Sequence, residues 1–120
     1  MQSVEEIQEI LNYAMSTEAY HKFSPFPQAP LITDGVQAIA DAAECFWLLD
    51  IIASYQPQRQ LDPHFQVWEL IVDLERKTAT VNGYNDTTLV VTQDIPFTLF
   101  PLPHLKLYVI DGIILLPSEY

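Results

Sequence analysis

The stretch ECFWLLDIIASYQ, residues 44–56, places one carboxylate among large apolar residues. Such a composition is typical of a buried helix, and Asp50 lies in its middle. At about 100° per residue, one narrow stripe of that helix would hold Val36, Ala43, Trp47, Asp50 and Ser54. Asp50 is therefore expected to point into the core. Because a buried, unpaired carboxylate costs several kcal/mol, it must be hydrogen-bonded, paired with a cation or protonated.

The side chains that could satisfy this carboxylate define a candidate buried polar site. Ser54 lies one helical turn later, and Arg59 and the backbone N–H groups of a proline-rich loop are further donors. Three interpretations stay open: Asp50 anchors that loop, is a pocket acid with a raised pKa, or belongs to a face that pairs two subunits. The first is our leading expectation. The candidate site comprises Asp50, Ser54, Trp47, His64 and Trp68.

Other residue types that carry chemistry lack the required spacing. His21, His64, His104 and Cys45 are single and far apart, without the ligand pairs of a zinc site. An aspartate and a serine on consecutive turns leave no place for an imidazole, so a catalytic triad is not expected. None of the three glycines forms a phosphate-binding loop. We therefore predict no catalytic residue, no metal and no cofactor, and favour a non-enzymatic protein.

Acidic residues dominate the charge of the chain. Sixteen acids against five Lys and Arg give a formal net charge of −11. This charge repels phosphate backbones, so we predict no direct binding of nucleic acid. It suits a basic protein partner, or a mimic of nucleic acid that occupies a partner's binding groove. The alternative is that the acids keep a chain with 49% hydrophobic residues soluble.

The N-terminus and the single cysteine bear on the compartment. MQSVEEIQEI lacks the basic and apolar segments of a secretion signal, and no apolar run approaches the roughly 20 residues that cross a bilayer. Cys45 has no partner for an intrachain disulfide, which fits a reducing compartment. The sequence thus predicts a cytoplasmic protein without a membrane partner.

The first segment is expected to be helical. Ser3 and Glu6 have the spacing of a capping box, and apolar residues then recur at three- and four-residue steps as far as Met15. STEAYHKF, residues 16–23, either continues this helix or forms a short second one. SPFPQAP, residues 24–30, has three prolines and is expected to be a rigid extended connection.

A change of hydrophobic period divides the rest of the chain. Helical periodicity runs from an N-cap at Thr33 or Asp34 to about Tyr55. Pro57 prevents the helix from continuing further. After a polar loop, FQVWELIVDLE alternates apolar and polar residues, which predicts a strand with one wet face.

Shorter strands and turns are expected to follow. TATV and TLVVTQDI are predicted strands, and the Asn-Gly of NGYND between them predicts a turn. PFTLFPLP, with its three prolines, crosses or edges the sheet. HLKLYVI and IILLP flank Asp-Gly, the strongest hairpin signal in the chain.

These elements predict an α+β fold. N-terminal helices, one of them long and central, pack on a C-terminal antiparallel sheet of four to five strands. Residues 1–120 form a single domain, with a helical part at 1–56 and a sheet part at 64–120. The apolar last strand is expected either to be central in the sheet or to pair across its edge in a homodimer.

Aromatic residues could also form a binding surface around the proline-rich loop. The residues concerned are Tyr13, Tyr20, Phe23, Phe26 and Tyr55. Packing in the core is the competing expectation for most of them, since aromatic side chains bury large apolar areas. A cluster of this kind would favour a protein partner.

Three motifs carry a resemblance to a known family. TDGVQAIADAAECFWLLDIIASYQ, FQVWEL and the closing LLPSEY together resemble an uncharacterised family of small bacterial, plasmid and phage proteins, from Thr33 onward. The family is a domain of unknown function, so the resemblance implies no activity, cofactor or catalytic residue. Occurrence on mobile elements implies an accessory or host-interacting role.

The leading functional hypothesis is a non-enzymatic, acidic protein-interaction domain. It would self-associate or bind a basic partner, as an accessory or inhibitor protein of a mobile element. The alternative is a small enzyme or ligand-binding module around Asp50, Ser54 and Trp47, which would need a solvent-connected pocket at that stripe.

Overall fold

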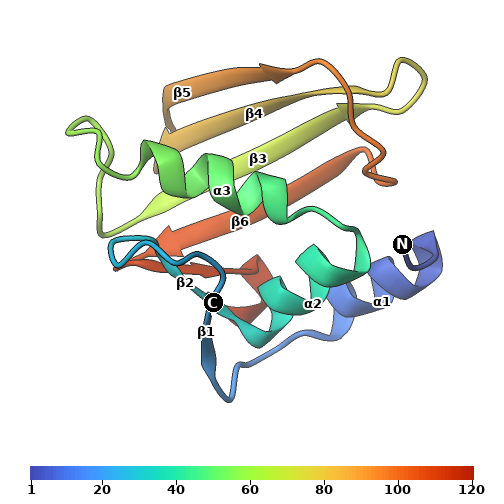
Figure 1. Ribbon diagram of the computed structural model, residues 1–120, viewed down its shortest axis with the longest axis horizontal. Helices are drawn as coiled ribbons and strands as arrows, with labels where there is room; N and C mark the ends of the chain where they lie inside the picture. Colours follow the sequence, from blue (N-terminus) through green and yellow to red (C-terminus); the bar gives the residue numbers. More distant parts are fainter.

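A computed structural model describes all 120 residues, Met1–Tyr120, as helices packed beside one seven-stranded mixed sheet (Figure 1). The elements are α1 (Val4–Tyr13), β1 (Tyr20–Lys22), β2 (Leu31–Thr33), α2 (Asp34–Ala42), α3 (Phe46–Tyr55), β3 (Gln66–Asp73), β4 (Thr78–Asn85), β5 (Thr88–Ile95), β6 (His104–Ile110), β7 (Ile113–Leu115) and a 3-10 turn at Pro117–Glu119. The strand order is β1-β2-β7-β6-β3-β4-β5. The predicted α+β class is confirmed.

The sheet is larger than the predicted four to five strands, and it is not purely antiparallel. Two three-residue strands were not predicted: β1 lies in residues 16–23, which were expected to be helical, and β2 directly follows the proline-rich connection at residues 24–30. β2 pairs with β7 in parallel, and all the other pairs are antiparallel. Strands of three residues are too short to show alternation, so residues 16–23 gave no strand signal.

The predicted long helix is instead two helices. Glu44 has a φ of 53°, in the left-handed region, and the chain turns there between α2 and α3. The N–H of Cys45 donates to the carbonyl of Ala40 at 2.9 Å, which closes the end of α2. No glycine or proline marks this break in the sequence, so apolar periodicity on both sides reads as one helix. Figure 1 shows α3 in front of β3 and β6, and α2 beside α1.

The Asn-Gly turn prediction is also wrong. Asn82 and Gly83 lie inside β4, and the turn to β5 falls at Asp86, whose φ is 56°. A Cβ on Gly83 would lie 2.8 Å from ring atoms of Trp68. The glycine therefore serves close packing against a tryptophan and not a positive φ.

The predicted hairpin at the C-terminus is confirmed. β6 and β7 pair across Asp111 and Gly112, whose φ values of 49° and 80° suit this tight turn. β7 lies between β2 and β6, which bears out the central position for this apolar strand. At the other end of the chain Ser3 caps α1, since its Oγ accepts from the N–H of Glu6 at 3.2 Å.

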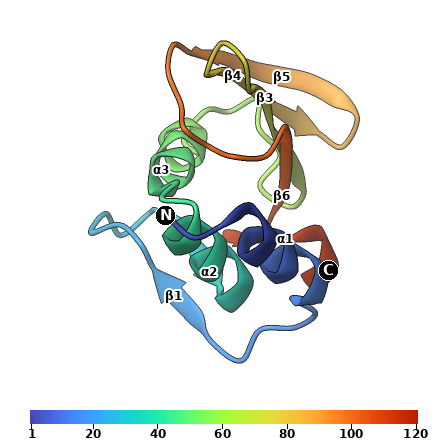
Figure 2. The same ribbon diagram turned by 90° about the vertical axis from the view of Figure 1, so that its right-hand side faces the viewer.

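The helices cover one face of the sheet and leave the other open (Figure 2). Twenty-five buried hydrophobic residues form one core between the two layers. On the open face, direct cross-strand partners from β5 to β7 form a row that we call the apolar belt: Leu89, Tyr84, Val67, Tyr108 and Leu115. The rings of Phe65 and Tyr120 pack on Tyr108 within this belt.

Candidate functional site

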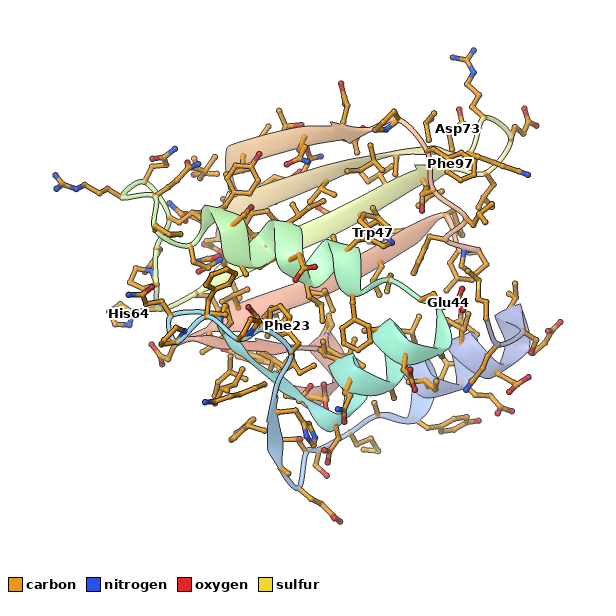
Figure 3. The ribbon with its side chains drawn as sticks, viewed as in Figure 1. Phe23, Glu44, Trp47, His64, Asp73 and Phe97 are labelled. Carbon is orange, nitrogen blue, oxygen red and sulfur yellow. The ribbon has the colours of Figure 1, made fainter.

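A groove of about 870 Å³ lies between α3 and the loop that joins β1 to β2. Its lining is mainly apolar on the loop side and mixed along the helix. It consists of Phe23, Ser24, Pro25, Phe26, Gln28, Ala29, Asp50, Ala53, Ser54, Gln56 and Pro57. The proline-rich connection is therefore one wall of this groove. Figure 3 shows Phe23 in this loop, below α3.

Two backbone hydrogen bonds, one within the loop and one at its end, help to hold the loop wall in place. Within the loop, the N–H of Ala29 donates to the carbonyl of Phe26 at 3.1 Å. At its end, the N–H of Leu31 donates to the carbonyl of Gly112 at 2.9 Å, which ties the loop to the β6–β7 turn. Three prolines restrict the remaining backbone, so the wall is stiff in the absence of a ligand.

A pair of glutamines, the half-buried Gln56 and the buried Gln66, fixes the helix wall. The amides of Gln56 and Gln66 bond each other reciprocally at 2.9 Å, and Gln66 Oε1 also accepts from the indole N–H of Trp68 at 2.8 Å. Gln66 Nε2 donates further to the carbonyl of Asp62 at 3.0 Å. Because Gln66 is only 1% exposed, breaking this network would leave buried polar groups unpaired. The end of α3 is thus held on β3.

Asp50 lies on the wall of the groove and not in the core. It is exposed, whereas Leu48, Leu49 and Ile52 form the buried side of α3. The prediction of a buried carboxylate is wrong because it assumed one helix. The turn at Glu44 resets the helical phase, so the stripe that began at Val36 does not continue into α3. Asp50 is the only charged side chain in the lining.

The other predicted site residues do not gather around Asp50. Ser54 lines the groove, but its Oγ donates to the carbonyl of Ile51 at 2.6 Å. Trp68 is buried and bonded to Gln66, and Trp47 is half-buried against the core. His64 is exposed, and its Nδ1 lies 2.8 Å from Asp111, whose hydrogen bond raises the pKa of His64.

The five residues of the predicted buried polar site therefore do not lie together. In Figure 3, Trp47 lies at the start of α3 and His64 beyond its other end. Only Asp50 and Ser54 share the groove. The buried polar site that does exist, Gln56 and Gln66 with Trp68, was missed apart from the tryptophan. Its signal is in the sequence, since Gln66 shares the period-two phase of Trp68, Leu70 and Val72.

The predicted aromatic surface is present in part. Phe23 and Phe26 line the groove, and Phe26 is 72% exposed. Tyr55 is half-buried instead, with its hydroxyl donating to Gln93 at 2.8 Å. Tyr13 and Tyr20 are exposed on α1 and β1 and are not part of the lining.

Two of the sequence motifs meet at the start of α2. Glu119 accepts hydrogen bonds from the Thr33 hydroxyl at 2.7 Å, the Leu116 N–H at 2.9 Å and the Gly35 N–H at 3.3 Å. A carboxylate at this position also complements the positive end of the helix. The TDG and PSEY segments therefore serve structure here, as an N-terminal cap supplied from the C-terminus.

No side chains are arranged for metal binding, and the single thiol is buried. No group of three His, Cys, Asp or Glu side chains lies close enough together to bind a metal ion. Cys45 is buried, and burial raises the pKa of its thiol to about 12. No helix has the length and apolar character required to cross a membrane.

Comparison with known families accounts for nearly the whole chain. The pattern of a family of unknown function, DUF6876, matches residues 5–120. The chain belongs to the DUF6876 family. Membership extends over α1 and the proline-rich loop, beyond the segment from Thr33 onward that carried the resemblance. No curated protein and no solved structure matches the chain. The groove is the feature of this DUF6876 member that bears most directly on its function.

Proposed function

We propose that this chain is a non-enzymatic protein-interaction domain that holds a basic segment of a partner protein in the groove. The observation that carries the proposal is the lining: apolar and aromatic walls around one carboxylate, that of Asp50. A lysine or arginine side chain could pair with this carboxylate while its aliphatic stem covers the apolar wall. An acidic or neutral segment would leave Asp50 unpaired.

The charge of the whole chain favours the same class of partner. The net charge is −11, and none of the three α-helices contains Lys or Arg. A basic segment would be drawn towards the helix side, where the groove opens. Such steering raises the association rate more than the affinity, and salt weakens it.

Phe26 supports the proposal as an anchor for the partner. Its side chain is 72% exposed at the groove, which is a large apolar area to leave in water. Covering about 40 Å² of it would contribute about 1 kcal/mol to binding, at roughly 25 cal/mol per Å² of apolar surface. Aromatic anchors of this kind supply much of the affinity in protein interfaces.

Catalysis at Asp50 has less support than binding. The lining holds no His, Cys, Lys or Tyr that could act with the carboxylate, and the Ser54 hydroxyl already donates to a carbonyl. The volume of about 870 Å³ does suit a small molecule. A small cationic ligand bound by the same carboxylate is therefore the second candidate.

A peptide titration with matched variants tests the proposal. A short blocked peptide of alternating arginine and leucine, labelled for fluorescence anisotropy, is titrated at low salt. Asp50→Asn and Phe26→Ala should each weaken binding about threefold to tenfold, because each removes a groove contact. The controls are Asp41→Asn and Phe97→Ala, since both side chains are exposed and neither lines the groove. They should change the affinity by no more than about twofold.

Three results would contradict the proposal. If Asp41→Asn weakens binding as much as Asp50→Asn, the attraction is diffuse and the groove is not the site. If a peptide with glutamine in place of arginine binds equally well, no basic segment is recognised. If free arginine saturates the groove and excludes the peptide at similar concentrations, the small-ligand candidate is the better one.

A sharper form of the proposal concerns the nature of the partner. A protein from a mobile element could use its acidic surface to occupy the nucleic-acid-binding site of a basic enzyme. In that case a short DNA duplex should displace the chain from such an enzyme, and added salt should weaken the complex. If DNA leaves the complex intact, the chain is not a mimic of nucleic acid. That result would not contradict the binding of a basic segment in the groove.

A further inference from the structure

The open face of the sheet carries an apolar strip where a sheet face in water is ordinarily polar. The apolar belt crosses five adjacent strands, from Leu89 on the edge strand β5 to Leu115 on β7. Tyr120 extends it, with a ring 5.6 Å from that of Tyr108 and 78% exposure. A contiguous apolar surface of this kind marks an interaction site more often than chance exposure does.

A polar row flanks the belt and carries both signs of charge. Lys106, Glu69, Asn82 and Thr92 are direct cross-strand neighbours on the same face. His104 adds a hydrogen bond to Glu69, with 2.6 Å between Nε2 and Oε2. An apolar strip beside a polar row of mixed charge matches the centre and rim of a protein interface.

Charge is divided between the two faces of the molecule. The three α-helices contain six of the sixteen acids and none of the five Lys and Arg residues. The cations lie in strands and loops, among them Lys22 on β1 and Lys106 on β6. The helix layer therefore carries acids and no cation, whereas the open sheet face places the cation Lys106 beside Glu69 and has two further acids, Asp73 and Asp94.

We propose that the open sheet face is an interface between two copies of this chain, packed belt to belt about a two-fold axis. A two-fold contact requires a surface that complements itself, which an apolar belt with a rim of both signs provides. It also turns the two acidic helix layers away from each other, so that the repulsion between two chains of charge −11 is smallest. A basic partner, by contrast, would be drawn to the acidic helix layer.

The dimer leaves both grooves free. Each groove lies between α3 and the β1–β2 loop. Both of these segments lie on the side of the sheet away from its open face (Figure 2), so two grooves would face outward from one assembly. A partner with two basic segments could then bind both, which raises its overall affinity without any new contact.

Sedimentation velocity on the full chain tests the interface. At about 100 μM the wild type should sediment as a dimer, with a Kd of about 10 μM or less. Val67→Glu and Tyr120→Glu place a charge in the belt and should raise the Kd at least about tenfold. Gln37→Glu adds the same charge to the exposed surface of α2, on the helix side of the molecule, and should leave the Kd within about threefold. Tyr120 is terminal and exposed, so its variant decides the result if Val67→Glu does not fold.

The salt dependence separates this interface from the groove. Added salt should leave the dimer unchanged or strengthen it, because it screens repulsion between like charges, whereas it should weaken peptide binding. A wild type that is monomeric at about 100 μM overturns the proposal. So does a dimer that survives both belt variants, or one that Gln37→Glu weakens equally.

Discussion

At the scale of single residues, one carboxylate joins the strand β1 to the start of α2. Asp34 lies 2.6 Å from Nε2 of His21, and its other oxygen accepts from the N–H of Glu18 at 2.8 Å. The hydrogen bond from His21 is the main reason that the pKa of Asp34 lies below its usual value of 3.8. The pair therefore holds the strand that begins the groove loop against the helix that follows it.

The pH dependence of this pair has a definite sign. Because the pKa of Asp34 is lower in the folded chain than in the unfolded one, the pair stabilises the fold above the unfolded value of 3.8. That stability is lost as the pH falls from about 4 through the folded pKa. In His21→Ala the pKa of Asp34 should return towards 3.8, and the fall in stability over this range should become flatter.

An NMR titration of the Asp34 carboxyl carbon measures this shift directly. His104→Ala is the matched control, since His104 pairs with Glu69 and should leave the pKa of Asp34 unchanged. An unchanged pKa of Asp34 in His21→Ala would contradict the account. It would mean that the backbone N–H of Glu18 and the hydroxyl of Thr17 hold the carboxylate alone.

Single residues also limit what the sequence reveals. Thr33 as the N-cap and the buried phase of Trp68, Leu70 and Val72 follow from spacing alone. The direction in which the Asp50 side chain points does not follow from spacing, because one residue with a positive φ resets the helical phase. Glutamate is not a residue type that favours a positive φ, so the sequence at Glu44 gives no indication of the break between the helices.

At the scale of elements, the C-terminus caps a helix that begins far away in sequence. Glu119 bonds the Thr33 hydroxyl and the Gly35 N–H, and 84 residues separate it from Gly35. A Cβ on Gly35 would lie 2.8 Å from the carboxylate of Glu119. The glycine is therefore suited to the approach of that side chain, although it lies in a helix where alanine is ordinarily better.

A double-mutant cycle tests this contact. In the wild type, Gly35→Ala should destabilise the fold by about 1 kcal/mol or more, because the new methyl group displaces the carboxylate. In Glu119→Ala the same substitution should be neutral or stabilising by up to about 1 kcal/mol, the usual gain of alanine over glycine in a helix. Urea denaturation of the four variants gives the values. Equal effects of Gly35→Ala in both backgrounds would exclude the contact.

Elements differ in how well the sequence predicts them. Long strands with clear alternation, such as β3, and the Asp-Gly hairpin of β6 and β7 are as predicted. The strands β1 and β2 are not, since their pairing depends on distant partners, and three residues carry no periodicity of their own. The groove was unpredictable for the same reason: one of its walls is the loop between these two strands.

At the scale of the whole molecule, two surfaces of different character lie on opposite sides. The helix side is acidic and contains the groove, whereas the sheet side carries the apolar belt. Composition predicts the net charge but not its distribution, which depends on which residues the fold brings to each side. Binding of a basic segment and self-association are thus separate properties and can be abolished separately.

Amide chemical shifts provide the most direct test of the central claim that the groove binds a basic segment. The arginine–leucine peptide is titrated into the isotope-labelled chain and into its Asp50→Asn variant. We expect saturable shifts confined to the loop 23–29 and to residues 50–57, which comprise the end of α3 and the turn after it, with weaker saturation in the variant. Shifts centred on the acidic face of α1, or equal in both proteins, would contradict the account.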